Sequence, residues 1–420
     1  MNEKGATVMR LFLEPADVAL FRDGRSFTAG SDHRARSLFP PNPSTVLGAL
    51  RCKLLMDTGV SLTAFAHGAP EAQVAIEQMG TRDGAPPFAL RGPFIAQMET
   101  NPNKDSDRQV QLYYPSPADL VKIDQKYHLL KPIAPGETLP FEANWPNSTQ
   151  NSNNTRFKKR FKLARQWVGK RHQVSVTALR PLWFSNAEKQ VEAEGWLDEQ
   201  TLQAYLNHTV LPDEFSVWRD EQLFARESRF GVAIDSRRKR YKDGMLYQIE
   251  FIRPREGVGL VVDVVKGAPS LDQQGLLSIG GESRAFHYYR LDIPREPVQP
   301  PGERFKIYFA TPAYFKGGWL PAQPWSKWFD GEVRLVAVAL RRARTISGVK
   351  VDTRSQQEGT FIKAGHKFVP PGSVYYFEAT RKVTYSGEPI SEFGDNQANS
   401  RAGYGSVLFG QWDYLTWRQT

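Results

Sequence analysis

His33 is the residue with the clearest potential for catalysis, because an imidazole titrates near neutral pH. It is followed closely by two cations, Arg34 and Arg36. A ribonuclease that needs no metal ion could use such a histidine as its general base. The same side chain in a basic loop could also contact a phosphate or a base without taking part in chemistry. We favour the contact and keep the catalytic role as an alternative.

Other patterns for metal, phosphate or nucleophilic chemistry fail on spacing or on residue type. The seven histidines are scattered, with no pair at the spacing of metal ligands. Gly405 and Gly410 have the spacing of a phosphate-binding P-loop, but Gln411 stands where that loop needs lysine. Cys52 falls within an expected helix, where a buried structural cysteine is the ordinary case. We therefore expect no metal, no cofactor and no catalytic centre.

Contact with phosphates is better supported, because cations and glycines gather in short stretches. Residues 156–172 hold eight Lys/Arg and residues 334–350 hold five, with no acid in either. Cations that neutralise phosphates release counterions, so such stretches favour a polyanion as partner. Two glycine-rich elements, 280–286 and 401–405, let backbone amides approach phosphates, and each carries an arginine and an aromatic ring that could stack on a base. The residues that we expect to contact RNA are His33, Arg34, Arg36, Ser44, Thr45, Arg51, Arg237, Arg238, Lys239, Arg240, Gly280, Gly281, Arg284, Phe286, Arg401, Gly403, Tyr404 and Gly405.

Each of these features also has a purely structural interpretation. The glycine-rich elements could be tight turns, with their aromatic rings in the core. The basic stretches could be solvated faces of a helix or a loop. These interpretations stay open at the level of the sequence.

A few strands and one helix must position these residues. Residues 7–21 are rich in apolar and β-forming types and predict a first strand. Three prolines then delay the next helix until Ser44 or Thr45, and leucines spaced by three and four residues predict a helix over about 45–56. The N–H groups at a helix N-terminus bind anions. A basic loop that leads into such an N-terminus therefore predicts a phosphate site.

Alternation of apolar residues is clearest within 229–265. Two alternating runs enclose the basic segment 235–244, which predicts a hairpin with a long cationic tip. Residues 293–302 contain four prolines and are the best linker candidate. Each half begins with a strand and carries a glycine-rich Ser-Arg element late, which suggests a duplicated α+β unit. The polar, Asn-rich segment 144–159 predicts a surface loop.

The composition excludes several classes of protein. With 420 residues, 40% of them hydrophobic, the chain can build cores for two or three domains and is not globally disordered. A formal net charge of +10 favours a polyanion as partner. A single cysteine excludes a disulfide framework and suits a reducing compartment. We see no long apolar run and no secretory signal, and we expect a cytoplasmic protein with no membrane contact.

Several motifs occur in an informative order along the chain. They are LFLEPADVALFRDGRSFTAGSDHRARSLFPPNPSTVLGALR, RFGVAIDSRRKRYKDGMLYQIEF, SIGGESRAF, ATPAYFKGGWLP, AGHKFVPPGSVYYF and GYGSVLFG. Together they resemble the RAMP superfamily of CRISPR-associated proteins. The resemblance is greatest to the subunit that caps the 5′ end of the guide RNA in type III-B (Cmr) effector complexes. It covers both ends of the chain and the block 229–290.

The resemblance implies an α+β fold made of two ferredoxin-like (RRM-like) RAMP modules. The first module would span 1–295, with a large insertion at about 60–225 and a basic hairpin thumb at 230–252. The second would span 296–420, with its glycine-rich loop at 400–410.

The resemblance also implies partners and a role. The partners would be crRNA, held by its repeat-derived 5′ handle, target RNA near that handle, the large polymerase/cyclase-type subunit and the backbone RAMP subunits. Target cleavage in such complexes is assigned to a repeated backbone subunit, which implies that this chain is not a nuclease. Two alternatives remain, namely an RNA-processing endonuclease of the same superfamily that uses His33, and a protein scaffold without specific affinity for RNA.

Overall fold

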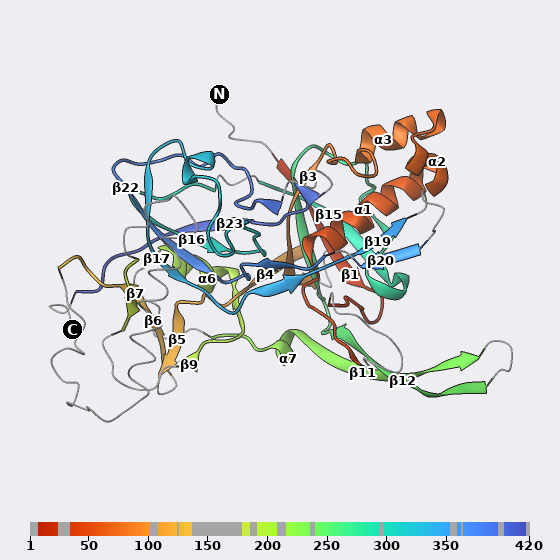
Figure 1. Ribbon diagram of the computed structural model, residues 1–420, viewed down its shortest axis with the longest axis horizontal. Coiled ribbons are helices and arrows are strands. Elements are labelled where there is room, and N and C mark those ends of the chain that lie inside the picture. Colours follow the sequence, from red (N-terminus) through yellow and green to blue (C-terminus); the bar gives the residue numbers. More distant parts are fainter. Residues whose placement is uncertain are drawn as a thin grey trace.

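The computed structural model is a strand-rich α/β protein with few helices (Figure 1). The residues that it describes are 7–23, 34–100, 108–123, 126–136, 179–184, 191–207, 216–235, 240–294, 298–352, 359–362, 364–393 and 399–416. The expected contact residues His33, Arg237, Arg238 and Lys239 lie outside this part of the chain, as do the stretches 144–159 and 156–172. The expected mixture of strands and helices is confirmed.

The larger sheet has seven strands, with β1 near its centre between β13 and β15. Its order is β10-β4-β3-β13-β1-β15-β14, and its neighbouring strands run antiparallel. Leu11 and Leu13 of β1 face one core, while Phe12 faces another, so both faces of the sheet are covered. The strands are β1 (Thr7–Pro15), β3 (Ala89–Thr100), β4 (Arg108–Pro115), β10 (Trp196–Asp198), β13 (Val258–Lys266), β14 (Gln274–Ser278) and β15 (Ala285–Pro294).

A helical layer covers the face of this sheet that Leu11 and Leu13 share. It consists of α1 (Pro43–Thr58), α2 (Leu62–His67), the 3-10 turn η1 (Pro70–Ala72) and α3 (Gln73–Met79). The expected helix over 45–56 is confirmed, since α1 buries Leu47, Leu50 and Leu54. It begins earlier than expected because a proline is favourable in the first helical turn, where its missing N–H costs nothing.

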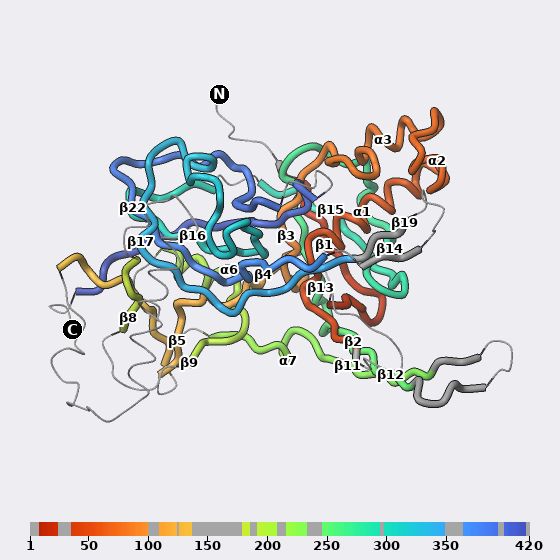
Figure 2. Tube along the Cα trace, in the orientation of Figure 1, coloured from red at the N-terminus to blue at the C-terminus, as the bar shows by residue number. Residues whose placement is uncertain are grey.

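The smaller sheet lies at the other end of the molecule from the helical layer (Figure 2). Its order is β17-β22-β16-β23, with antiparallel neighbours. Numbered along the chain, its strands stand in the order second, third, first, fourth. The strands β3-β13-β1-β15 of the larger sheet have the same order. The strands of this half are β16 (Arg304–Phe309), β17 (Val333–Ala339), β22 (Val374–Ala379) and β23 (Val407–Gln411), with the short pairs β18 (Arg344–Ile346) and β21 (His366–Phe368), and β19 (Val349–Asp352) and β20 (Gly359–Ile362).

Among the described residues of the second half there is no α-helix, so the α+β unit that the sequence suggested is not seen in this part of the chain. The 3-10 turn η3 (Trp325–Lys327) lies there. Aromatic side chains take the place of a helical layer on one face of the smaller sheet. Phe305 stacks on Phe377 with ring centroids 5.4 Å apart, and Trp325 meets Phe377 edge-on at 4.8 Å. These rings bury enough apolar surface to cover the face without a helix.

The two sheets share one core, which joins the halves of the chain. Phe12, Phe94 and Val261 of the larger sheet pack in the same cluster as Tyr308, Val374 and Tyr376 of the smaller sheet. Helix α6 (Glu199–Asn207) contributes Leu202 and Tyr205 to it. The Pro-rich segment 293–302, the expected linker, falls between β15 and β16 in the sequence, and residues 295–297 of it lie outside the described part of the chain.

The expected hairpin is present and projects from the body (Figure 1). Strands β11 (Phe224–Asp235) and β12 (Arg240–Pro254) pair antiparallel, and β2 (Arg34–Ala35) adds a parallel strand beside β12. The pairing reaches Asp235 and Arg240, so the basic loop is shorter than the expected span of 235–244. The alternation of apolar residues in the sequence ends at Ile234 and resumes at Met245, whereas the pairing of β11 with β12 continues to Asp235 and Arg240. Polar and basic residues therefore extend β12 towards the tip of the hairpin.

The span 60–225 is not an insertion throughout. Helices α2 and α3 and strands β3, β4 and β10 belong to the main sheet and to its helical layer. The elements outside that sheet are β5 (Leu120–Ile123), β6 (Lys126–Leu129), β7 (Lys131–Pro132), β8 (Leu182–Trp183), β9 (Val191–Glu192), α6 and α7 (Asp220–Leu223). The expected boundary was wrong because the strands that pair with β13 are distant from it in the sequence.

Candidate RNA-binding surface

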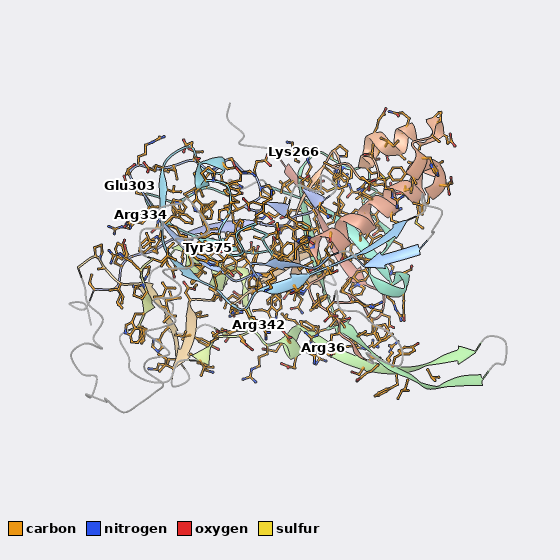
Figure 3. The ribbon with its side chains drawn as sticks, in the orientation of Figure 1. Arg36, Lys266, Glu303, Arg334, Arg342 and Tyr375 are labelled. Atoms are coloured by element: carbon orange, nitrogen blue, oxygen red, sulfur yellow. The ribbon has the colours of Figure 1, made fainter. Side chains whose placement is uncertain are left out.

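Hydrogen bonds fasten the basic loop after β2 to the root of the hairpin. The buried Ser37 hydroxyl donates to the Glu250 carbonyl at 2.6 Å, and Arg226 donates to the Glu250 carboxylate at 2.9 Å and to the Ser37 carbonyl at 3.0 Å. Arg36 lies next to this junction with an exposed side chain (Figure 3). Expected contact residues 34 and 240 are strand residues of the same hairpin sheet, since Arg34 pairs with Gln248 and Arg240 with Asp235.

The N-terminus of α1 is held by the second half of the chain. The Ser44 and Tyr404 hydroxyls share a hydrogen bond of 3.0 Å, and the Thr45 N–H donates to the Asn42 carbonyl at 2.9 Å. The Asn42 side chain does not cap the helix. Arg51 points away from this end and donates to the carbonyls of Gly80 and Thr81. Arg51 therefore supports a neighbouring turn, whereas Ser44 joins the start of α1 to the second half.

The glycine-rich elements serve close backbone packing. The Gly281 N–H donates to the Leu20 carbonyl at 2.7 Å, and the Gly405 N–H donates to the Pro312 carbonyl at 2.8 Å. A Cβ on Gly403 would lie 2.5 Å from the Gly92 carbonyl oxygen of β3, and one on Gly280 would lie 2.4 Å from the Leu20 carbonyl oxygen. The expectation that these elements offer free amides to phosphates is therefore corrected for Gly281 and Gly405, whose N–H groups already have partners inside the chain.

The two aromatic rings expected to stack on bases are buried. Phe286 is fully buried, and Tyr404 is 3% exposed and packs on Phe368 and Phe393. Neither ring has a free face in this conformation, so the expected stacking role is wrong for both. Apolar packing between distant elements determined their positions, and the sequence pattern does not reveal it.

The arginines beside the glycines differ in their contacts. Arg401 donates to the Pro86 carbonyl at 2.7 Å, and its own carbonyl accepts from the Leu90 N–H at 2.9 Å. Arg284 is partly exposed, donates to Glu282 at 2.5 Å and lies 5.0 Å from the centre of the Phe251 ring. Arg401 therefore joins the two halves, while Arg284 lies at the surface near the hairpin root.

A cleft of about 550 Å³ lies between the two halves, and the sequence did not single out its lining residues. Prolines from both halves and aromatic residues of the first half form much of its wall, and Arg341, Arg342 and Arg344 add charge. Arg342 is exposed and lies on the same edge of the molecule as Arg36 (Figure 3). Arg341 is engaged, donating to Ser116 Oγ at 2.9 Å and to the Ala193 carbonyl at 2.8 Å. The acid-free stretch 334–350 was the available signal, but only the fold shows which of its cations face the cleft.

Within the described part of the chain, no group of three or more His, Cys, Asp or Glu side chains could hold a metal ion. In the same residues, no helix combines the length and the apolar character needed to cross a membrane.

The fold and this surface define a basic α/β protein in which two sheets of matching strand order flank a cleft and carry a projecting hairpin. The chain belongs to the family described as CRISPR-associated protein (Cas_Cmr3), whose family model matches residues 11–412. The resemblance to type III-B CRISPR-associated proteins is thereby confirmed. None of the curated proteins matches the chain.

Similar chains occur in solved structures of larger assemblies. One comes from a cryo-EM structure of the type III-B Cmr-beta bound to cognate target RNA and AMPPnP, with 16% identity, a TM-score of 0.40, and 87% of this chain and 86% of that chain covered. Another comes from a cryo-EM structure of the type III-B Cmr-beta bound to cognate target RNA, with 15% identity, a TM-score of 0.41, and coverages of 95% and 96%.

Proposed function

We propose that the chain is a non-catalytic RNA-binding subunit of a type III-B CRISPR effector complex, which binds and caps the repeat-derived 5′ handle of crRNA. In that complex it links the large subunit to the backbone subunits and takes part in antiviral defence. Target RNA next to the handle is a further partner. The observation that carries this proposal is the family match, which extends over residues 11–412.

Two structural features support this role. The shared strand order of the two sheets is that of a split β-α-β-β-α-β unit, which favours two ferredoxin-like modules, the second without its helices among the described residues. Sheets of this kind commonly bind single-stranded RNA. The hairpin is the second feature. Its root is tied to the basic loop through Ser37, Arg226 and Glu250, so the backbone that carries the exposed Arg36 has a fixed position.

The test is a binding and cleavage assay with the purified chain. Labelled RNA carries either the repeat-derived 5′ handle or a scrambled handle of equal length, with and without EDTA. We expect tighter binding to the handle, and RNA that stays intact in every lane. Cut RNA would favour the endonuclease alternative, with His33→Ala as the next variant. Equal and weak binding to both RNAs would favour the protein scaffold.

A further inference from the structure

We propose that the cleft between the two halves holds one unpaired nucleotide of the bound RNA, and that it favours a base with an amino group over uracil. The proposal rests on the proposed function, because it names the place where one nucleotide of the handle lies. The residues that would contact the nucleotide are Arg342 and Arg344, which would bind its phosphate, and Glu194, which would select its base; none of them was among the expected contacts.

The size and the lining of the cleft fit a single nucleotide. Its volume of about 550 Å³ lies within the range of sites for small ligands and leaves no room for a base-paired segment. The partly exposed prolines Pro40, Pro115, Pro370 and Pro371 contribute apolar walls from both halves. A proline ring has no rotamer freedom to lose, so a ligand orders little of this wall when it binds.

One part of the cleft fits an anion. Arg342 is exposed and Arg344 is half-buried, and among the described residues no salt bridge joins either of them to a carboxylate, although Asp23 attracts the Arg344 guanidinium. Burial lowers the pKa of Arg344, because removing its guanidinium from water disfavours the charged form. A phosphate would restore the lost favourable interaction and could bind both guanidinium groups. Pro43 of the first turn of α1 lines the same cleft, and the positive end of the helix dipole adds to the attraction.

Another part of the cleft fits a base and not a phosphate. Three carboxylates line it, and two have partners in the chain: Asp220 accepts from the Trp196 indole at 2.8 Å, and Glu192 lies 3.9 Å from Arg341. Glu194 is exposed and has no such partner among the described residues. A carboxylate repels phosphate but accepts hydrogen bonds from amino groups, as acidic side chains do from N4 of cytosine. Uracil has no amino group, and its single N3–H lies between two carbonyl oxygens that a carboxylate repels.

The experiment measures the affinity of the full-length chain for handle RNAs in which each position carries A, C, G or U in turn. In the wild type, we expect one position where uridine weakens binding by about tenfold, the size of one good base contact. Glu194→Gln should remove that preference, because an amide can also donate to a uracil oxygen. Arg342→Gln combined with Arg344→Gln should weaken binding to all of these RNAs alike. Arg381→Gln is the matched control, since Arg381 is exposed in the same half and does not line the cleft.

The outcomes separate this proposal from the proposed function. If the Arg342/Arg344 variant keeps wild-type affinity while Arg34→Ala with Arg36→Ala loses it, the cleft proposal is wrong and handle binding stands. The absence of a base preference in the wild type would also overturn the cleft proposal. If the cleft variants bind RNA normally but fail to assemble with other effector subunits, the cleft docks a protein and the proposal fails.

Equal affinity for handle and scrambled RNA contradicts only the proposed function, because a base preference that Glu194→Gln removes can be measured on either RNA. Thermal melting of each variant checks that it folds.

Discussion

Lys306 is a lysine in a place where lysines are seldom found, the core between the two sheets. Lys306 is 3% exposed. Its Nζ donates to the Tyr205 carbonyl at 3.1 Å and lies 3.4 Å from the centre of the Tyr205 ring. Removal from water disfavours the charged ammonium and lowers the pKa of Lys306 to about 8. The two halves therefore meet around a group that is charged at neutral pH and costs free energy to bury.

This burial predicts a pH dependence of stability. The pKa of Lys306 in the folded chain is below its ordinary value of 10.5, so above pH 8 the unfolded chain binds more protons and stability rises with pH. Between pH 7 and pH 9.5, the wild type should gain roughly 2 kcal/mol in free energy of unfolding relative to Lys306→Met. Urea denaturation at both pH values measures the difference. Lys266→Met, at an exposed lysine, is the control, and the difference in free energy of unfolding between it and the wild type should be the same at both pH values. A constant difference between the wild type and Lys306→Met would contradict the prediction.

Individual residues were the least predictable part of the candidate surface. Cations and glycines stand in the same short stretches of the sequence, but the sequence could not tell which side chains point outwards. Phe286 and Tyr404 are buried because strands distant in the sequence pack over them. Arg401 binds a carbonyl of the other half for the same reason. Exposure depends on long-range packing, which leaves no local signal in one sequence.

At the scale of elements, local patterns were predictable and long-range contacts were not. The hairpin and helix α1 follow from apolar spacing over a few residues, and both are confirmed. The conformation of the glycine-rich loop before β23 depends instead on a contact with a distant strand. Gly403 has a φ of 105° and its backbone touches that of Gly92 on β3. This contact requires a residue without Cβ, and it forms between positions that no short pattern connects.

Two glycines give opposite predictions for the same substitution. Gly403→Ala should destabilise the chain by about 1–3 kcal/mol, because an L-residue is strained at this φ and its Cβ would clash with the Gly92 carbonyl. Gly48→Ala should stabilise it by about 0.5–1 kcal/mol, since Gly48 lies inside α1 with no atom within 4 Å of an added Cβ. Thermal melting of both variants tests the pair. Equal melting temperatures would show that the loop does not depend on close contact with β3.

At the scale of the whole molecule, the net charge of +10 matters less than the places where cations stay exposed. Many arginines are paired with acids within the chain, as Arg253 is with Glu227 and Asp17. Arg36 and Arg342 remain at the surface on one edge of the molecule (Figure 3). The total charge was available from composition, whereas the cleft could not be foreseen, because its lining comes from segments spread over most of the chain.

The salt dependence of RNA binding tests whether this edge contacts phosphates. Arg34→Ala combined with Arg36→Ala should weaken handle binding and reduce the slope of log affinity against log salt by about 1.4, the value for two phosphate contacts on a single strand. Arg381→Ala combined with Lys382→Ala, at exposed positions away from the hairpin, should leave the slope unchanged. Filter binding over a series of salt concentrations measures both variants. A slope identical to the wild type would remove Arg34 and Arg36 from the RNA-binding surface.

The contact between the glycine-rich loop and β3 also bears on how the chain folds during synthesis. One hydrogen bond beside this contact joins the Arg401 side chain to the Pro86 carbonyl, and these two residues are 315 positions apart in the sequence. The ribosome therefore makes the first sheet long before the segment that completes it, and the Leu90 amide has no partner from Arg401 until then. On the ribosome, the first half therefore lacks these contacts until the segment around Arg401 has emerged. Newly made chains would be exposed to proteases and to aggregation throughout that interval, and they would depend on chaperones more than the compact native state suggests.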